Sequence, residues 1–204
     1  GAHIQVVNFD NNNTYEMLPV VWSDSLIDVL QSFEHVKVAA PFYTKPGIAK
    51  TSDAFQGVVF KGTTYWDYFG ANLSEGALPA ASNEIIVSRR LADKLQLSVT
   101  DPLFLYFVGE EVKVRKVRVT GIYHTGVGEF DDTFIIGTPA FVTQLNQWSD
   151  CQASGLELLV DNFSHLEQAF DEVYFATANR LDEDGNAYYT QTIEQLNTQI
   201  FSWL

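Results

Sequence analysis

The densest group of side chains that could do chemistry lies in the run His124-Thr125-Gly126-Val127-Gly128-Glu129-Phe130-Asp131-Asp132. One imidazole and three carboxylates could hold a metal ion or act as acid and base, so a metal-dependent hydrolase is one interpretation. The two glycines instead favour a turn between strands with solvated charges. We favour the turn, because no second metal-binding cluster accompanies it in the sequence. We therefore predict contact with a partner, rather than catalysis, for Gly126, Glu129, Phe130, Asp131 and Asp132.

Other chemical motifs are weaker. The four histidines are scattered, none of their pairs has the spacing of a zinc site, and Cys151 is the single cysteine. Asp182 to Gly185 resembles the start of a calcium loop, but the sixth and twelfth positions would be Ala187 and Ile193. Nucleotide-binding and nucleophile motifs are missing from the sequence. We therefore expect no catalytic residue, no metal, no cofactor and no enzymatic activity.

Composition narrows the class of protein further. The chain carries 26 acidic residues against 12 basic ones, a formal net charge of −14, which disfavours nucleic acid as a partner. Hydrophobic residues make up 46% of the chain, enough for a packed core. No run of about 18 apolar residues could span a bilayer. The abrupt start and end lead us to expect a piece of a longer protein, and a free secreted module that binds through its acidic surface is the alternative.

The two ends of the chain share one pattern. Near the start, a strand at 4–9, a helix at 22–33 capped by Ser23, and a strand at 35–44 are followed by a predicted turn at Lys45-Pro46-Gly47. Near the end, a strand at 155–160 precedes a helix behind the capping box Ser164–Glu167, then a short strand at 187–190. A last helix is predicted from Thr192, with an apolar stripe formed by Ile193, Leu196, Ile200 and Trp203. We predict one discontinuous α/β subdomain built from residues 1–51 and 151–204.

The middle of the chain is richer in strands. Leu103 to Val119 is predicted to be a β-hairpin with a tight turn from Val108 to Glu111. A change of phase at Arg115-Lys116 predicts a bulge in its second strand. Residues 52–150 are therefore predicted to form a mostly β insert, which makes the fold class α+β.

The order of motifs in this insert resembles that of MacB-like periplasmic core domains. The matching segments begin with Phe55 to Gly62, Tyr65 to Phe69 and Leu73 to Pro79. They continue with Asn83 to Leu97, Val117 to Gly126 and Glu129 to Asp132. Each motif alone is weak, whereas six in this order are fairly specific.

The resemblance implies a fold and a function. The expected fold is a split α/β Porter-like subdomain with an inserted β-rich Sabre-like subdomain. The expected function is that of the periplasmic domain of an ABC-transporter permease in the bacterial inner membrane, in the group of LolC/LolE, MacB and FtsX. Its implied partners are a cytoplasmic ATPase subunit, a second permease subunit or a second copy, and a lipoprotein or other envelope substrate.

The hairpin departs from part of this family. LolC-type subunits carry a long hook there, which captures the lipoprotein chaperone LolA, whereas the turn here is short. The chain therefore looks more like LolE or an undivided relative. We expect the hairpin to bind a LolA-like chaperone weakly or not at all.

Overall fold

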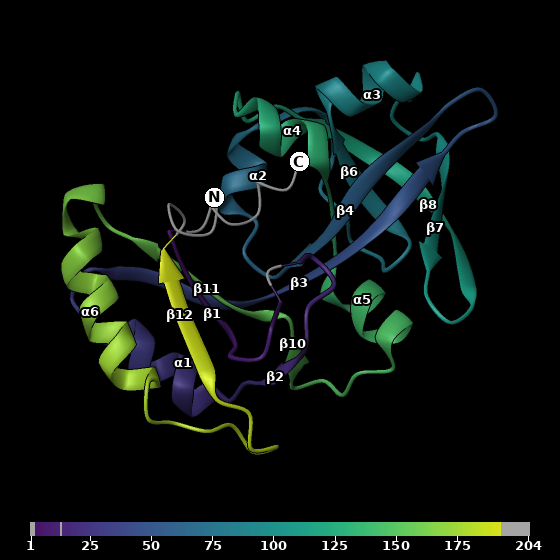
Figure 1. The fold of residues 1–204 in the computed structure, drawn as a ribbon. Helices are drawn as coiled ribbons and strands as arrows, with labels where there is room; N and C mark the ends of the chain where they lie inside the picture. The colour runs from purple at the N-terminus through teal and green to yellow at the C-terminus, as the bar shows by residue number, and fades with distance from the viewer. Residues whose placement is uncertain (1–2, 13, 193–204) are drawn as a thin grey trace. The chain divides into compact units, whose positions relative to one another are not determined.

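The computed structural model describes residues 3–12 and 14–192. The chain forms two compact units: unit 1 contains residues 1–42 and 146–204, and unit 2 contains residues 43–145 (Figure 1). The chain passes from unit 1 to unit 2 inside one strand, β3 (Val36–Lys50). The predicted turn at Lys45-Pro46-Gly47 is therefore wrong, because these residues continue β3. The two units meet in the chain at 42/43 and 145/146, and the boundaries predicted from the sequence lie at 51/52 and 150/151.

Unit 1 is built on an antiparallel sheet that joins the two ends of the chain. β1 (Ile4–Asn8) lies between β11 (Gly155–Val160) and β12 (Tyr188–Thr192), and β11 pairs on its other side with the first part of β3. Ile4 is opposite Leu158 on one side and Thr192 on the other. The described part of the chain thus begins and ends on neighbouring strands.

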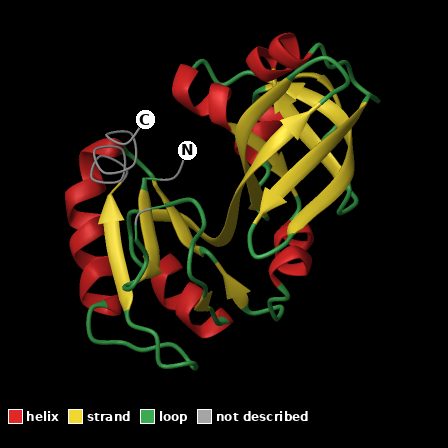
Figure 2. Cartoon of the chain, turned by 45° about the vertical axis from the view of Figure 1, so that its right-hand side comes forward, coloured by secondary structure: helices red, strands yellow, loops and turns green. Residues whose placement is uncertain are grey.

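Two helices of unit 1 pack on one face of this sheet: α1 (Asp24–Gln31) and α6 (Leu166–Thr177) (Figure 2). Alternate strand residues point to them, because side chains of a strand alternate between its two faces. A small two-stranded sheet of β2 (Val20–Val21) and β10 (Gln152–Ala153) completes the unit. The shared core includes Ile4, Val6, Leu26, Leu30, Leu156, Leu158, Ala169 and Val173.

Helix caps show where local sequence decides the structure. Ser23 accepts a hydrogen bond from the Leu26 amide at 3.1 Å, as the sequence predicts. The capping box predicted at Ser164 and Glu167 is not formed. A 3₁₀ turn, η1 (Phe163–His165), precedes α6, and Asn162 caps this turn by accepting from the Ser164 amide. The extra turn moves the start of α6 past Ser164.

Unit 2 is a closed barrel of six strands. In order around it, the end of β3 is followed by β4 (Phe55–Thr63), β9 (Phe134–Gly137), β6 (Glu84–Ser88) and β8 (Val112–Tyr123). β7 (Pro102–Val108) closes the ring by pairing with both β8 and β3. β5 (Leu73–Gly76) pairs with the end of β8. Closure leaves the six strands without a free edge.

The hairpin of β7 and β8 lacks the predicted bulge, because its register runs without a shift from Pro102–Arg118 to Val108–Val112. Val112 and Val114 are exposed, whereas Val117 and Val119 are buried. The change of phase in the sequence therefore marks two faces of one regular strand, one facing solvent and one facing the barrel interior.

The barrel core is apolar and aromatic; for example, the rings of Phe60 and Phe141 stack with centroids 4.2 Å apart. Four helices accompany the barrel strands: α2 (Asp67–Ala71), α3 (Arg89–Leu95), α4 (Gly128–Thr133) and α5 (Pro139–Asn146). None of the helices within residues 3–12 and 14–192 is long and apolar enough to cross a membrane. Thr192 ends β12, and the predicted last helix lies outside the described residues. The observed fold confirms the predicted α+β class.

Candidate functional site

The predicted partner-binding segment connects β8 to β9, and part of it is helical. After Tyr123 the chain forms a short loop and then α4, so the predicted turn holds only for the residues before Gly128. Asp131 accounts for this shape. Its carboxylate is fully buried and accepts hydrogen bonds from the amides of Thr125 (3.1 Å) and Gly126 (3.4 Å) and from the Thr125 hydroxyl.

Burial corrects the role predicted for Asp131. A carboxylate that is enclosed and bonded to the loop backbone cannot contact a partner directly. It holds the loop in place, because one buried carboxylate accepts hydrogen bonds from two successive residues of the loop. His124 lies beside it, with Nδ1 3.5 Å from Asp131 Oδ2 and its own side chain largely exposed.

Asp132 points to α3 instead. Arg90 donates to both of its oxygens, from Nε at 2.7 Å and from Nη2 at 3.0 Å, and Lys94 approaches at 3.4 Å. The hydrogen bonds from Arg90 lower the pKa of the Asp132 carboxyl. This bidentate pair fixes α4 against α3 at the surface.

Phe130 is half-buried and has a packing role. Its ring stacks on Phe134, with centroids 4.6 Å apart, and on Phe69 at 6.1 Å. The predicted partner-binding group therefore divides in two. Asp131 and Phe130 support the loop from within, whereas Gly126 and Glu129 are exposed at its surface. Val127, which the prediction did not include, is exposed beside them.

The hydrolase interpretation needs these groups to converge on one point, and they do not. Within the described residues, one group of three potential metal ligands comes together, and it contains none of the residues of this loop. Asp131 faces inward, Asp132 faces Arg90, and Glu129 faces solvent. The carboxylates of this loop thus point in three different directions.

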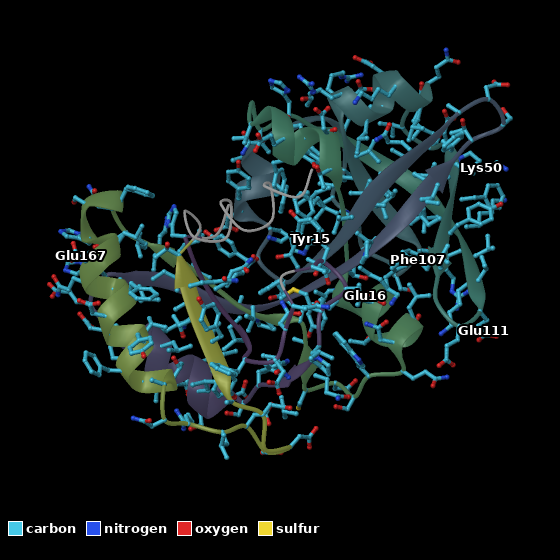
Figure 3. The ribbon with its side chains drawn as sticks, in the orientation of Figure 1. Tyr15, Glu16, Lys50, Phe107, Glu111 and Glu167 are labelled. Carbon is cyan, nitrogen blue, oxygen red and sulfur yellow. The ribbon has the colours of Figure 1, made fainter. Side chains whose placement is uncertain are left out.

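The hairpin tip is the second surface feature of unit 2. The turn between β7 and β8 contains only Gly109, Glu110 and Glu111, and Figure 3 shows Glu111 at this tip. Val108 and Val112, which flank the turn, are 73% and 60% exposed. The tight turn predicted from the sequence is present.

A third cluster, of two histidines and one aspartate in unit 1, was not predicted from the sequence. His35 and His165 stack with ring centroids 3.8 Å apart, and both face the carboxylate of Asp161. The His35 Nδ1 lies 2.9 Å from Asp161 Oδ2, and the His165 Nδ1 lies 3.0 Å from Asp161 Oδ1. Hydrogen bonds from His35 and His165 lower the pKa of Asp161 to about 2, and the bond to Asp161 raises the pKa of His35. The sequence offered only the Asp161–His165 spacing of four residues as a signal.

Comparisons with known proteins show which family has this architecture. The family model of the MacB-like periplasmic core domain matches residues 2–174. The extracellular domain of the noncanonic ABC-type transporter YknZ from Gram-positive bacteria is similar in structure, with a TM-score of 0.59 and 13% identity, over 93% of this chain and 98% of that one.

The periplasmic region of MacB from Actinobacillus actinomycetemcomitans gives a TM-score of 0.58 and 10% identity, over 98% of this chain and 92% of that one. A search of curated protein sequences found no match. At such low identity the structural likeness shows the fold, and the family match extends over most of the chain. The resemblance seen in the sequence is thus confirmed, and the chain belongs to the family of MacB-like periplasmic core domains.

Proposed function

We propose that this chain is the extracytoplasmic domain of an ABC-transporter permease subunit in a bacterial inner membrane. In this proposal it couples ATP hydrolysis by a cytoplasmic ATPase to the extraction or export of an envelope substrate. The family match over residues 2–174 carries the proposal. The fold shared with domains of two ABC-type transporters supports it.

The sheet of unit 1 suits such a role. Because Ile4 is paired with Thr192, the described chain enters and leaves unit 1 on adjacent strands. A domain inserted between two membrane helices needs this arrangement, since both connections must return to the same bilayer. A free secreted module, the alternative considered from the sequence, has no such requirement.

We also propose that the domain acts without chemistry of its own. The loop that offered an acid–base group uses Asp131 to hold its backbone and Asp132 to bind Arg90. Both carboxylates are thus engaged in stabilising contacts. The exposed Gly126, Val127 and Glu129 remain as the surface proposed for contact with a substrate, a second permease subunit or a second copy of this chain.

Within this family we favour a lipoprotein-releasing permease of the LolE or undivided kind. The three-residue hairpin turn supports this choice, because a hook-bearing LolC-type subunit needs a longer excursion. The second candidates are an export permease of the MacB type and a mechanotransmitting permease of the FtsX type, which share the fold.

Reconstitution tests the proposal. The full-length permease and its ATPase are placed in proteoliposomes with a labelled lipoprotein, and ATP-dependent release is measured beside ATP hydrolysis. We expect release with the intact permease and none when residues 3–192 are replaced by a short linker, although the ATPase still assembles. Equal release from both would overturn the coupling role. ATP hydrolysis and domain-dependent export of a soluble substrate, without lipoprotein release, would favour the MacB-type candidate.

A further inference from the structure

The cluster of His35, Asp161 and His165 lies where three segments of unit 1 meet. His35 is in the connection from α1 to β3, Asp161 directly follows β11, and His165 ends η1 before α6. The Asp161 amide donates to the His35 carbonyl at 2.9 Å, and the His165 amide donates to the Asn162 carbonyl at 2.9 Å. The backbone therefore holds all three side chains in one place.

The spacing of the three ligand atoms is close to what a metal ion needs. One nitrogen from each histidine and one Asp161 oxygen lie within 4.8 Å of one another. Two ligands of a tetrahedral zinc ion, each about 2.1 Å from it, are roughly 3.4 Å apart. The nitrogen–oxygen distances, 2.9 Å from His35 to Asp161 Oδ2 and 3.0 Å from His165 to Asp161 Oδ1, are shorter than this, so the side chains move apart to admit an ion. Proton loss from the two Nδ1 atoms would free their lone pairs for it.

The donor set favours a particular class of ion. Imidazole nitrogen suits zinc, copper, nickel and iron, whereas calcium and magnesium prefer an all-oxygen shell. Two histidines and one carboxylate occupy three positions and leave one for water, as in open zinc sites. His35 is held firmly, because its side chain is only 13% exposed. An imidazole nitrogen binds a metal in the plane of its ring, and two nearly parallel rings with centroids 3.8 Å apart do not direct both Nδ1 lone pairs to one point. The ring of His165, whose side chain is 41% exposed, therefore turns out of the stack when the ion binds.

The surroundings also favour a cation. Glu34 Oε2 lies 3.8 Å from His35 Nε2, the ring nitrogen that would face away from the ion. At this distance the Glu34 carboxylate makes no hydrogen bond to the ring, but its negative charge favours a cation nearby. The chain as a whole carries a net charge of −14, so its field attracts cations.

From this geometry we infer that His35, Asp161 and His165 bind one divalent transition-metal ion of the zinc class. Both histidines coordinate through Nδ1 and Asp161 through its carboxylate, and water occupies the open position. The ion ties the α1–β3 connection, the end of β11 and the start of α6 together. This site is distinct from the proposed transport role and does not depend on it.

Titration of the metal-stripped, tag-free chain with Zn²⁺ alone, followed by calorimetry, tests the inference. We expect one Zn²⁺ per chain and a higher melting temperature with the ion. His165→Ala and Asp161→Asn should each weaken binding by at least about 100-fold, since even changes outside the ligand shell cost about 10–100-fold. Co²⁺ should give the intense visible absorption of a tetrahedral site in the original chain and not in these variants.

Two matched variants control for chance binding. His124→Ala removes a largely exposed histidine that also faces an aspartate but has no second histidine beside it. Cys151→Ser removes the exposed thiol. Both should bind Zn²⁺ like the original chain. Circular dichroism checks that each variant is folded; if His165→Ala is not, His165→Gln replaces it. Equal affinity in the original chain and the folded ligand variants, or loss of binding in Cys151→Ser, would overturn the inference.

Discussion

Thr125 donates two hydrogen bonds to Asp131, one from its amide and one from its hydroxyl, and the carboxylate that accepts them is fully buried. This relationship makes the connection between β8 and β9 a fixed structure, since the same carboxylate also accepts from the Gly126 amide. The exposed residues of the loop are thus presented from a rigid base. If the loop contacts a partner, its shape depends on a residue that the partner does not touch.

Replacement of Asp131 should therefore affect stability. We expect Asp131→Ala to lower the free energy of unfolding by about 2–3 kcal/mol, because it removes three hydrogen bonds to a charged acceptor and empties the buried space of its side chain. Urea-induced unfolding measures the change. Glu129→Ala, at an exposed position of the same helix, should change stability by less than about 0.5 kcal/mol. Equal effects of the two variants would contradict the supporting role of Asp131.

A close approach between two backbone segments of unit 2 explains why residue 121 is a glycine. A Cβ at Gly121 would lie 2.7 Å from the Ala77 carbonyl oxygen and 3.1 Å from that of Glu75, which are backbone atoms of a neighbouring segment. We expect Gly121→Ala to destabilise the chain by about 1–3 kcal/mol, the usual cost of overpacking. The midpoint of thermal or urea unfolding reports it.

Gly57, in β4, is the matched control, because a Cβ there would meet nothing within 4 Å. Gly57→Ala should be neutral or slightly stabilising, since it restricts the unfolded chain. A Gly121→Ala variant as stable as Gly57→Ala would show that β8 can move away from the segment at Ala77.

Asp182 makes the stability of unit 1 depend on pH. Partial burial alone would raise the pKa of its carboxyl, but hydrogen bonds from Val21, Asn186 and Asp184 outweigh it and lower the pKa below the ordinary 3.8. The Val21 amide donates at 2.8 Å, from a residue far away in the sequence. A lowered pKa in the folded state means that Asp182 stabilises the fold above its ordinary pKa. This contribution is lost as the pH falls through the lowered value.

We expect Asp182→Asn to cost about 1–2 kcal/mol at pH 7, because the amide group cannot accept from all these donors. The difference in stability between Asp182→Asn and the original chain should shrink below about pH 4. Urea unfolding at pH 7 and at pH 3 measures it. A difference that is the same at both values would refute the contribution of the ionised carboxyl.

The hairpin tip should not capture a chaperone. Three turn residues extend at most about 10 Å, too little to enter the cavity of a partner, and Glu110 and Glu111 favour water over an apolar pocket. Titration of the chain with a LolA-like chaperone from the same cell should show binding weaker than about micromolar. Micromolar or tighter binding that is lost in the double variant Glu110→Ala/Glu111→Ala, and kept when the exposed Asp150 is changed to Ala, would sink this prediction.

Local features of the fold followed from the sequence alone. The cap at Ser23, the tight turn at Gly109 to Glu111 and the apolar face of α6 depend on residues a few positions apart. Hydrogen bonds and apolar periodicity over a few positions depend only on the types of neighbouring residues, so a sequence pattern predicts them. The motifs of the middle segment likewise indicate the family, because the resemblance depends on residue types in a given order and not on contacts between distant residues.

The tertiary structure decided what depends on distant partners. Lys45 to Gly47 look like a turn in isolation, but β7 pairs with the following part of β3 and keeps the strand extended. Asp131 looked exposed among polar neighbours, and only the packing of α4 turned it inward. His35 and Asp161 are 126 positions apart, so nothing local linked them. Their meeting depends on β11 lying against β3, a register set by the burial of one whole sheet face rather than by either residue.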